Sequence, residues 1–299
     1  MTMRDRDRLQ RFLFEQFPIR GRLVHVDAAW RALIEHREYP AAIRDLLGEA
    51  VAATLLLAGT IKFDGVLSLQ LQGAGPAHLL LAQCTSGLGV RGLARYSGDP
   101  GPGGIADLVG PGNLAVTLES EDKSQRYEGV VPIDGTRLAD SLQRYFENSE
   151  QLPTRLWLHA DADGASGMLL QQLPAGAGAG AAVDAEAAAD AWRRVQLIGD
   201  TLTTEELRTL ADTELLRRLF NEDDLRVFDP APVYFRCRCS RERVAGMLEG
   251  LGEAETRSVL AEHGSVEVRC DFCNRAYVFD AVDVAGLFQD AVAGGGSIH

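Results

Sequence analysis

Four of the five cysteines of this chain stand in two short pairs near its C-terminal end. The first pair is Cys237-Arg238-Cys239, and the second, 31 positions after Cys239, is Cys270-Asp271-Phe272-Cys273. Structural zinc sites have four ligands at the corners of a tetrahedron, and two short knuckles with two thiolates each form a closed site. In a reducing compartment, such paired cysteines indicate a metal site or a redox pair before static disulfides. The sequence therefore predicts one Zn²⁺ bound by Cys237, Cys239, Cys270 and Cys273.

The segment that carries these cysteines is too small to be very stable without the metal. We place it at residues 231–291, with helices expected from Ser240 and over 253–262, and strands at 266–268 and 277–279. At this size an apolar core alone gives marginal stability. A structural zinc ion supplies about 10–16 kcal/mol of apparent folding free energy, against about 5–15 kcal/mol for a whole domain. We therefore expect the metal to decide whether this unit is folded.

The first 175 residues have the pattern of a mixed α and β domain. Apolar and polar residues alternate with period two, as in half-buried strands, and turn-forming glycines and prolines separate these runs from two helical patterns. The predicted strands include 23–26, 67–72, 114–118, 157–159 and 168–170, and the predicted helices are 41–58 and 136–148. The fold class is therefore α+β, with a core domain over 1–175.

A helical linker is predicted over residues 176–230, between the core domain and the cysteine-bearing domain. It opens with the low-complexity letters GAGAGAA and carries 6 basic and 12 acidic side chains. One helix begins at Asp184, and a second begins at a capping box over 203–206. The two helices share an amphipathic stripe that needs a docking surface. Its members are Trp192, Val195, Leu207, Ala211, Leu215 and Leu219.

Charge and hydropathy exclude several classes of protein. The chain has 30 basic and 43 acidic residues, a net charge of −13, so general affinity for nucleic acid is not expected. Its most apolar window, 50–61, is shorter than a membrane span. The N-terminus shows no secretion signal. We therefore expect a cytoplasmic protein without membrane contact, with residues 292–299 as a flexible tail.

The remaining residues that could carry chemistry give no catalytic pattern. Cys84 lies in a strand-like apolar run and is expected to be a small buried residue. The histidines lack ligand spacing and receive no role, and no nucleophile, base and oxyanion donors come together, so no enzyme is predicted. From the residues alone, two functions stay open, namely a structural zinc ribbon that binds nucleic acid and a CxxC thiol oxidoreductase.

Long stretches of the chain resemble the 33-kilodalton heat-shock protein family, the redox-regulated holdase chaperones of bacteria. The stretches that carry the resemblance are NEDDLRVFDPAPVYFRCRCSRERVAGMLEGLG, VEVRCDFCNRAYVFDAVDV, KFDGVLSLQLQGAGP, VRGLAR and YFENSEQLPTRLWL. The chain departs from the family pattern at Arg238, at Cys84 and in the alanine and glycine run of the linker.

The resemblance implies an ATP-independent chaperone of the oxidative stress response. In the reduced, inactive state the four cysteines would bind Zn²⁺. Oxidation would form the disulfides Cys237–Cys239 and Cys270–Cys273 and expel the metal. The small domain and the linker would then loosen, and exposed apolar surface would capture unfolding client proteins. The oxidised protein would form a homodimer. We expect the linker stripe to cover an apolar patch of residues 1–175 in the reduced form and to take part in client binding.

Overall fold

The structure, a computed structural model, describes residues 6–174 and 184–293, the last five of these by their backbone alone. Two compact units divide the chain between Arg236 and Cys237. The predicted low-complexity start of the linker and the last six residues of the predicted tail lie outside the described residues. Each unit is described by itself below.

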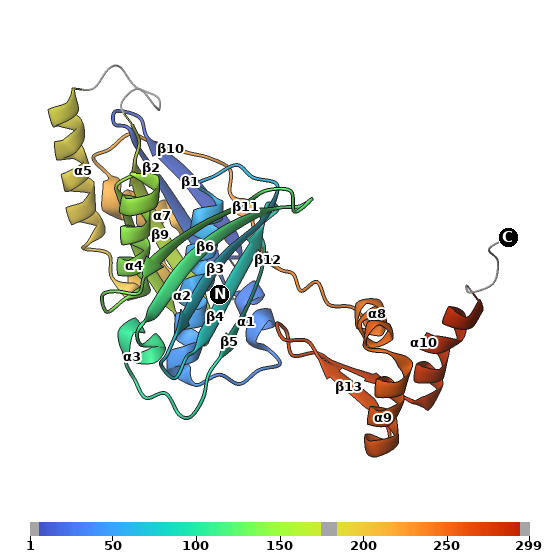
Figure 1. Cartoon of the computed structure of the whole chain (residues 1–299). Helices are drawn as coiled ribbons and strands as arrows, with labels where there is room; N and C mark the ends of the chain where they lie inside the picture. The colour runs from blue at the N-terminus through green and yellow to red at the C-terminus, as the bar shows by residue number, and fades with distance from the viewer. Residues whose placement is uncertain (1–5, 175–183, 294–299) are drawn as a thin grey trace. The chain divides into compact units, whose positions relative to one another are not determined.

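Two six-stranded sheets form the framework of the first unit (Figure 1). The first sheet has the order β10-β1-β2-β9-β8, with β11 also paired to β1, and the second has the order β12-β5-β4-β3-β6-β7. The strands of the first sheet are β1 (Arg8–Phe14), β2 (Ile19–Val26), β8 (Thr154–Ala160), β9 (Ala165–Gln172), β10 (Leu225–Val227) and β11 (Ala231–Pro232). Those of the second are β3 (Gly65–Gly73), β4 (Leu79–Thr85), β5 (Gly89–Arg95), β6 (Gly112–Ser120), β7 (Arg126–Pro132) and β12 (Tyr234–Phe235).

Helix α2 (Ala41–Ala58) lies in the main core and contacts strands of both sheets. Its sequence is apolar on almost every side, as expected for a helix buried all round. Three shorter helices and one π-helical turn complete this part of the unit: α1 (Ala28–Ile34), α3 (Ile105–Val109), α4 (Leu138–Tyr145) and η1 (Phe146–Glu150). The predicted α+β class is confirmed. Within the described residues, no helix combines the length and apolar composition that crossing a bilayer requires.

The linker helices cover the face of the first sheet that is turned away from α2. They are α5 (Ala185–Gly199), α6 (Thr204–Thr209) and α7 (Asp212–Phe220). Their apolar side chains form a second core with residues of β1, β2 and β9. The sheet contributes Phe12, Phe14, Ile19, Leu23, Met168 and Leu170. Of the predicted stripe, Val195, Leu207, Leu215 and Leu219 are at most 4% exposed, and Trp192 is half-buried against the same core.

One helix predicted from Thr203 through Leu219 is in fact two. The capping box forms as expected, since the Thr203 hydroxyl accepts from the Glu206 amide at 3.2 Å. The backbone then becomes extended at Leu210 and Ala211. Arg6 bonds to the carbonyls of Arg208 and Leu210, replacing partners that a continuing helix would give. The break leaves Ala211 exposed, so this member of the predicted stripe does not cover the sheet.

After α7 the chain pairs with strands of both sheets before it reaches the cysteines. Strands β10 and β11 pair with β1, and β12 pairs in parallel with β5. Residues 231–236, expected to open the zinc-binding domain, therefore belong to the first compact unit. Whether residues 176–230 behave as a separate linker stays a prediction.

The second unit is a small assembly of three helices and one hairpin. Its elements are α8 (Arg241–Leu251), α9 (Glu253–His263), β13 (Val266–Arg269), β14 (Ala276–Phe279) and α10 (Ala281–Ala293). The predicted helix starting after Ser240 is confirmed, because the Ser240 hydroxyl accepts from the amide of Arg243. Its buried apolar core has six side chains among the described residues: Val244, Leu248, Val266, Tyr277, Phe279 and Val284.

Docking of the linker helices should depend on the buried side of their stripe. Leu215→Ala removes a fully buried side chain and should destabilise the docked state by about 2–5 kcal/mol. Amide hydrogen exchange across α5–α7 should rise, while exchange in α2 stays unchanged. The control is Leu197→Ala in α5, where the side chain is 65% exposed. Equal exchange in the two variants would contradict the docking described here.

Candidate metal centre

Local structure brings the two cysteine pairs into turns. Cys237 and Cys239 lie between β12 and the capping residue of α8, and Cys270 and Cys273 lie in the turn between β13 and β14. The amide of Cys270 donates to the carbonyl of Arg275 at 3.0 Å, which continues the hairpin ladder. The amide of Asn274 donates to the carbonyl of Cys270 at 2.8 Å, and Asn274 has a left-handed backbone with φ of 55°. Asparagine tolerates this conformation, which lets the turn close.

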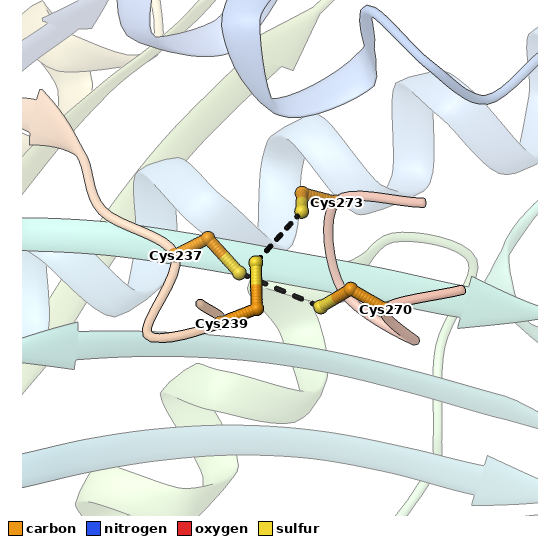
Figure 2. Close-up of side chains that lie close together, drawn as sticks. All are labelled: Cys237, Cys239, Cys270 and Cys273. Atoms are coloured by element: carbon orange, nitrogen blue, oxygen red, sulfur yellow. Dashed lines mark hydrogen bonds between the residues drawn. The ribbon is translucent and has the colours of Figure 1, made fainter. Parts of the chain in front are cut away.

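The four sulfur atoms point toward one another (Figure 2) and lie within 4.8 Å of one another. Two contacts join one pair to the other: Sγ of Cys237 lies 3.6 Å from Sγ of Cys270, and Sγ of Cys239 lies 3.3 Å from Sγ of Cys273. With Zn–S bonds of about 2.3 Å, a tetrahedron has sulfur atoms about 3.8 Å apart. These thiols therefore suit a single tetrahedral metal ion. All four are free cysteines, so the pairing Cys237–Cys239 and Cys270–Cys273 stays a prediction for the oxidised state.

A tyrosine hydroxyl donates a hydrogen bond to one of the four sulfurs. Tyr277 of β14 donates a hydrogen bond from its hydroxyl to Sγ of Cys239 at 3.1 Å. Burial alone would raise the pKa of Cys239, but this bond and those from the neighbouring thiols bring that pKa down to about 7. Burial raises the pKa of Cys237 and Cys273. Cys239 is therefore the sulfur that this environment favours as thiolate.

Two of the arginines near the cysteines are paired with carboxylates. A cation beside a thiol favours the thiolate. Arg241, however, pairs with Asp283 at 2.7 Å and lies over the ring of Phe279 at 4.3 Å. Arg269 pairs with Glu267. Burial and hydrogen bonding are therefore the main causes of the pKa shifts of the thiols.

Two other residues considered from the sequence, Cys84 and His25, are buried in the first unit. Cys84 is fully buried in β4, and burial raises its pKa to about 12, as expected of a small apolar residue. His25 is buried beside Asp212, a contact that sequence spacing does not reveal. The role of Tyr277 is also missed from sequence, because 38 residues separate it from Cys239. The sequence signal for this role is a polar residue on the buried side of a strand that follows a cysteine pair.

The profile of the family described as Hsp33 protein matches residues 7–280. The chain belongs to the Hsp33 family. Among Hsp33 relatives, a 33 kDa chaperonin of Nitrosococcus oceani is 48% identical over 290 residues, which cover 97% of each chain. A 33 kDa chaperonin of Methylobacillus flagellatus is 44% identical and covers 96% of each chain. The likeness therefore includes the linker and the cysteine-bearing unit as well as the core.

The Hsp33 fold is also found by comparison of structures. The crystal structure of the 33 kDa chaperonin of Thermotoga maritima superposes with a TM-score of 0.78 at 21% sequence identity. The match covers 96% of this chain and 99% of the other. At this level of identity the comparison supports the fold alone. The family profile and the two relatives confirm the sequence-based resemblance to the family.

The Tyr277 hydroxyl should strengthen metal binding at this Hsp33 centre. Outer-sphere hydrogen bonds fix a ligand, and their loss typically lowers metal affinity about 10–100-fold. Tyr277→Phe removes only the hydroxyl and should lower Zn²⁺ affinity about tenfold, measured by competition with a chromophoric chelator. Tyr234→Phe, at an exposed tyrosine of the first unit, is the matched control. Unchanged affinity in Tyr277→Phe would show that its bond to Cys239 is dispensable.

Proposed function

We propose that this protein is a redox-regulated, ATP-independent holdase chaperone of the cytoplasm, active under oxidative stress. The observation that carries the proposal is the convergence of four thiols on one point in a unit with a very small apolar core. Membership of the Hsp33 family and relatives named 33 kDa chaperonin support it. The clients would be proteins that unfold under stress.

Zn²⁺ is the metal that we assign to this centre. Four cysteine sulfurs form a soft ligand set, which selects zinc over the hard cations magnesium and calcium. A site closed by four protein thiolates leaves no position for a substrate or water, as in structural zinc centres. Cys237, Cys239, Cys270 and Cys273 would hold the ion in the reduced state. When bound, it supplies folding free energy.

Oxidation would convert the ligands into two disulfides. In each step two thiolates form one S–S bond and give up two electrons. Hydrogen peroxide, the oxidant, accepts these electrons together with two protons from solvent, its O–O bond breaks, and two water molecules form. A disulfide sulfur no longer binds zinc as a thiolate does, so the ion would leave. The second unit would then depend on six buried apolar side chains, which is little for a separately folded body.

Loss of order next to the linker would expose apolar surface. Only one residue, Arg236, lies between the end of strand β12 and Cys237, so disorder at the first cysteine pair would begin beside the strands that follow α7. The face of the first sheet under α5–α7 is rich in large apolar side chains, including Phe12, Phe14 and Met168. We propose that this face and the buried stripe of α5–α7 bind clients after release. An apolar surface of this kind binds without sequence specificity, because burial of apolar area is non-directional.

The oxidised protein would act as a homodimer, and excess negative charge would keep it soluble. The linker region 176–235 has twice as many acidic as basic side chains, and charge repulsion opposes self-aggregation of its loosened state. Neither a nucleic acid nor a membrane is among the proposed partners.

Light scattering of a client that unfolds on heating tests the holdase function. Oxidised protein should suppress the scattering without ATP, and reduced, zinc-loaded protein should not. The matched control is Cys84→Ser, which removes the cysteine outside the centre and should leave the response to peroxide intact. Suppression by neither form would overturn the proposal, and turnover in an insulin reduction assay would favour a thiol oxidoreductase.

Removal of the metal under reducing conditions tests the structural role of the centre. Because zinc binding contributes about 10–16 kcal/mol, a strong chelator should unfold the second unit. The circular dichroism signal of α8–α10 should fall, and exchange across 237–293 should become fast, while α2 keeps its protection. A second unit that stays ordered without metal would contradict the proposed switch.

A further inference from the structure

A group of charged side chains fixes the junction between α6 and α7 to the first sheet. Nε2 of His25 lies 3.0 Å from Oδ1 of Asp212, and Nε of Arg8 donates to Oδ2 of the same carboxylate at 2.7 Å. The side chains of His25 and Asp212 are 1% and 5% exposed. Arg6 donates from Nη1 to the carbonyl of Leu210 at 2.8 Å and bonds to the carbonyl of Arg208. We call Arg6, Arg8, His25 and Asp212 the polar latch.

The fold places the latch where three strands and one helix meet. In the strand register, His25 of β2 lies opposite Arg8 of β1 and opposite Ser166 of β9. Asp212 is the first residue of α7, directly after the two extended residues that separate the helices. The carboxylate reaches the histidine only because the helix is broken there. The break and the polar contacts thus belong to one structural feature.

The latch differs in its physics from the apolar contacts beside it. Apolar packing in the second core is non-directional and is compatible with small shifts of the helices. A buried charge pair has a fixed geometry, because any shift leaves a charge without a partner in a dry environment. Its net effect on stability is small, since the loss of hydration roughly offsets the attraction. The latch therefore specifies one docked position but adds little to the free energy of docking.

We propose that the polar latch fixes the docked position of α5–α7 and keeps docking weak enough to be reversible. This inference rests on the proposed function, in which the linker helices are released. While docked, the Asp212 carboxylate accepts the hydrogen bond of Arg8 and lies beside His25. On release all three side chains become hydrated again, so their separation costs little free energy. Separation of an apolar pair would instead expose apolar surface to water. With the latch, the helices are either docked in one position or released, and little free energy is needed to release them.

Two kinds of variant should act in opposite directions. Asp212→Asn removes the counter-charge of Arg8 inside the interface, so exchange in α6 and α7 should rise about 100-fold or more in reduced, zinc-loaded protein. The triple variant Arg8→Met, His25→Leu and Asp212→Val replaces the whole group by apolar side chains and leaves no charge unpaired, so exchange should be equal or slower. Amides of α2 serve as the internal reference, because they report global opening.

Glu214→Gln is the matched control, since it removes an acidic residue from the same first turn of α7 at an exposed position. It should leave exchange within about twofold of the parent, as surface substitutions do. If Asp212→Asn does not fold, Arg8→Gln carries the same expectation with a smaller effect, about tenfold, because the Arg8 side chain is 33% exposed. Unchanged exchange in Asp212→Asn and Arg8→Gln, or a faster rate in the apolar triple variant, would overturn the inference.

Aggregation assays separate this inference from the proposed function. Asp212→Asn should suppress client aggregation at a lower temperature or oxidant dose than the parent, and the apolar triple variant should need a higher temperature or dose. If exchange changes as expected but no form of the protein holds a client, the latch stands and the chaperone proposal falls. If oxidised parent protein holds clients but exchange ignores Asp212→Asn, the chaperone proposal stands and the latch falls.

Discussion

In the proposed function, the second unit depends on the meeting of four cysteine sulfurs. The sulfurs come from two turns 31 positions apart, and all lie within 4.8 Å of one another. The apolar core of the described part of this unit has six buried side chains. If a metal ion joins the four sulfurs, much of the stability of the unit would be concentrated at that point. A chemical change to two sulfur atoms would then alter the order of a whole domain, which a distributed apolar core would not permit.

The first unit is organised on the opposite principle. Its main core is continuous, with α2 in contact with both sheets, and no single residue decides its fold. The second core, under α5–α7, is smaller than the main core but is not organised around a single site. It is apolar enough to hold the helices, yet the polar group of Arg8, His25 and Asp212 lies at the junction of α6 and α7 and contributes little net free energy. In the function proposed above, the molecule would join a stable body, a conditionally docked cover and a metal-dependent unit in one chain.

Sequence patterns predicted most of the fold because they report local physics. The bounds of α2 follow from an apolar run between turn residues, and the hairpin around Cys270 and Cys273 follows from β-branched and aromatic residues on both sides of a tight turn. The break at Leu210 could not be predicted in this way, since the apolar stripe of Leu207, Ala211, Leu215 and Leu219 continues through it at steps of four. Long-range contacts decide that position, because Arg6 bonds to the carbonyls of Arg208 and Leu210, some 200 residues away in the sequence. The same limit explains why the cysteine ligand set could be predicted from spacing, while the bond from Tyr277 could not.

The parallel pairing of β12 with β5 has a mechanical consequence. This strand is two residues long, and only Arg236 separates it from Cys237. At about 3.3 Å per residue, one residue provides almost no slack. A displacement of Cys237 by more than a few ångströms must therefore pull on the hydrogen bonds of Tyr234 and Arg236 to β5 and its preceding turn. The connection between β12 and Cys237 is therefore too short to take up such a displacement, and the strain falls on the hydrogen bonds at the edge of the second sheet.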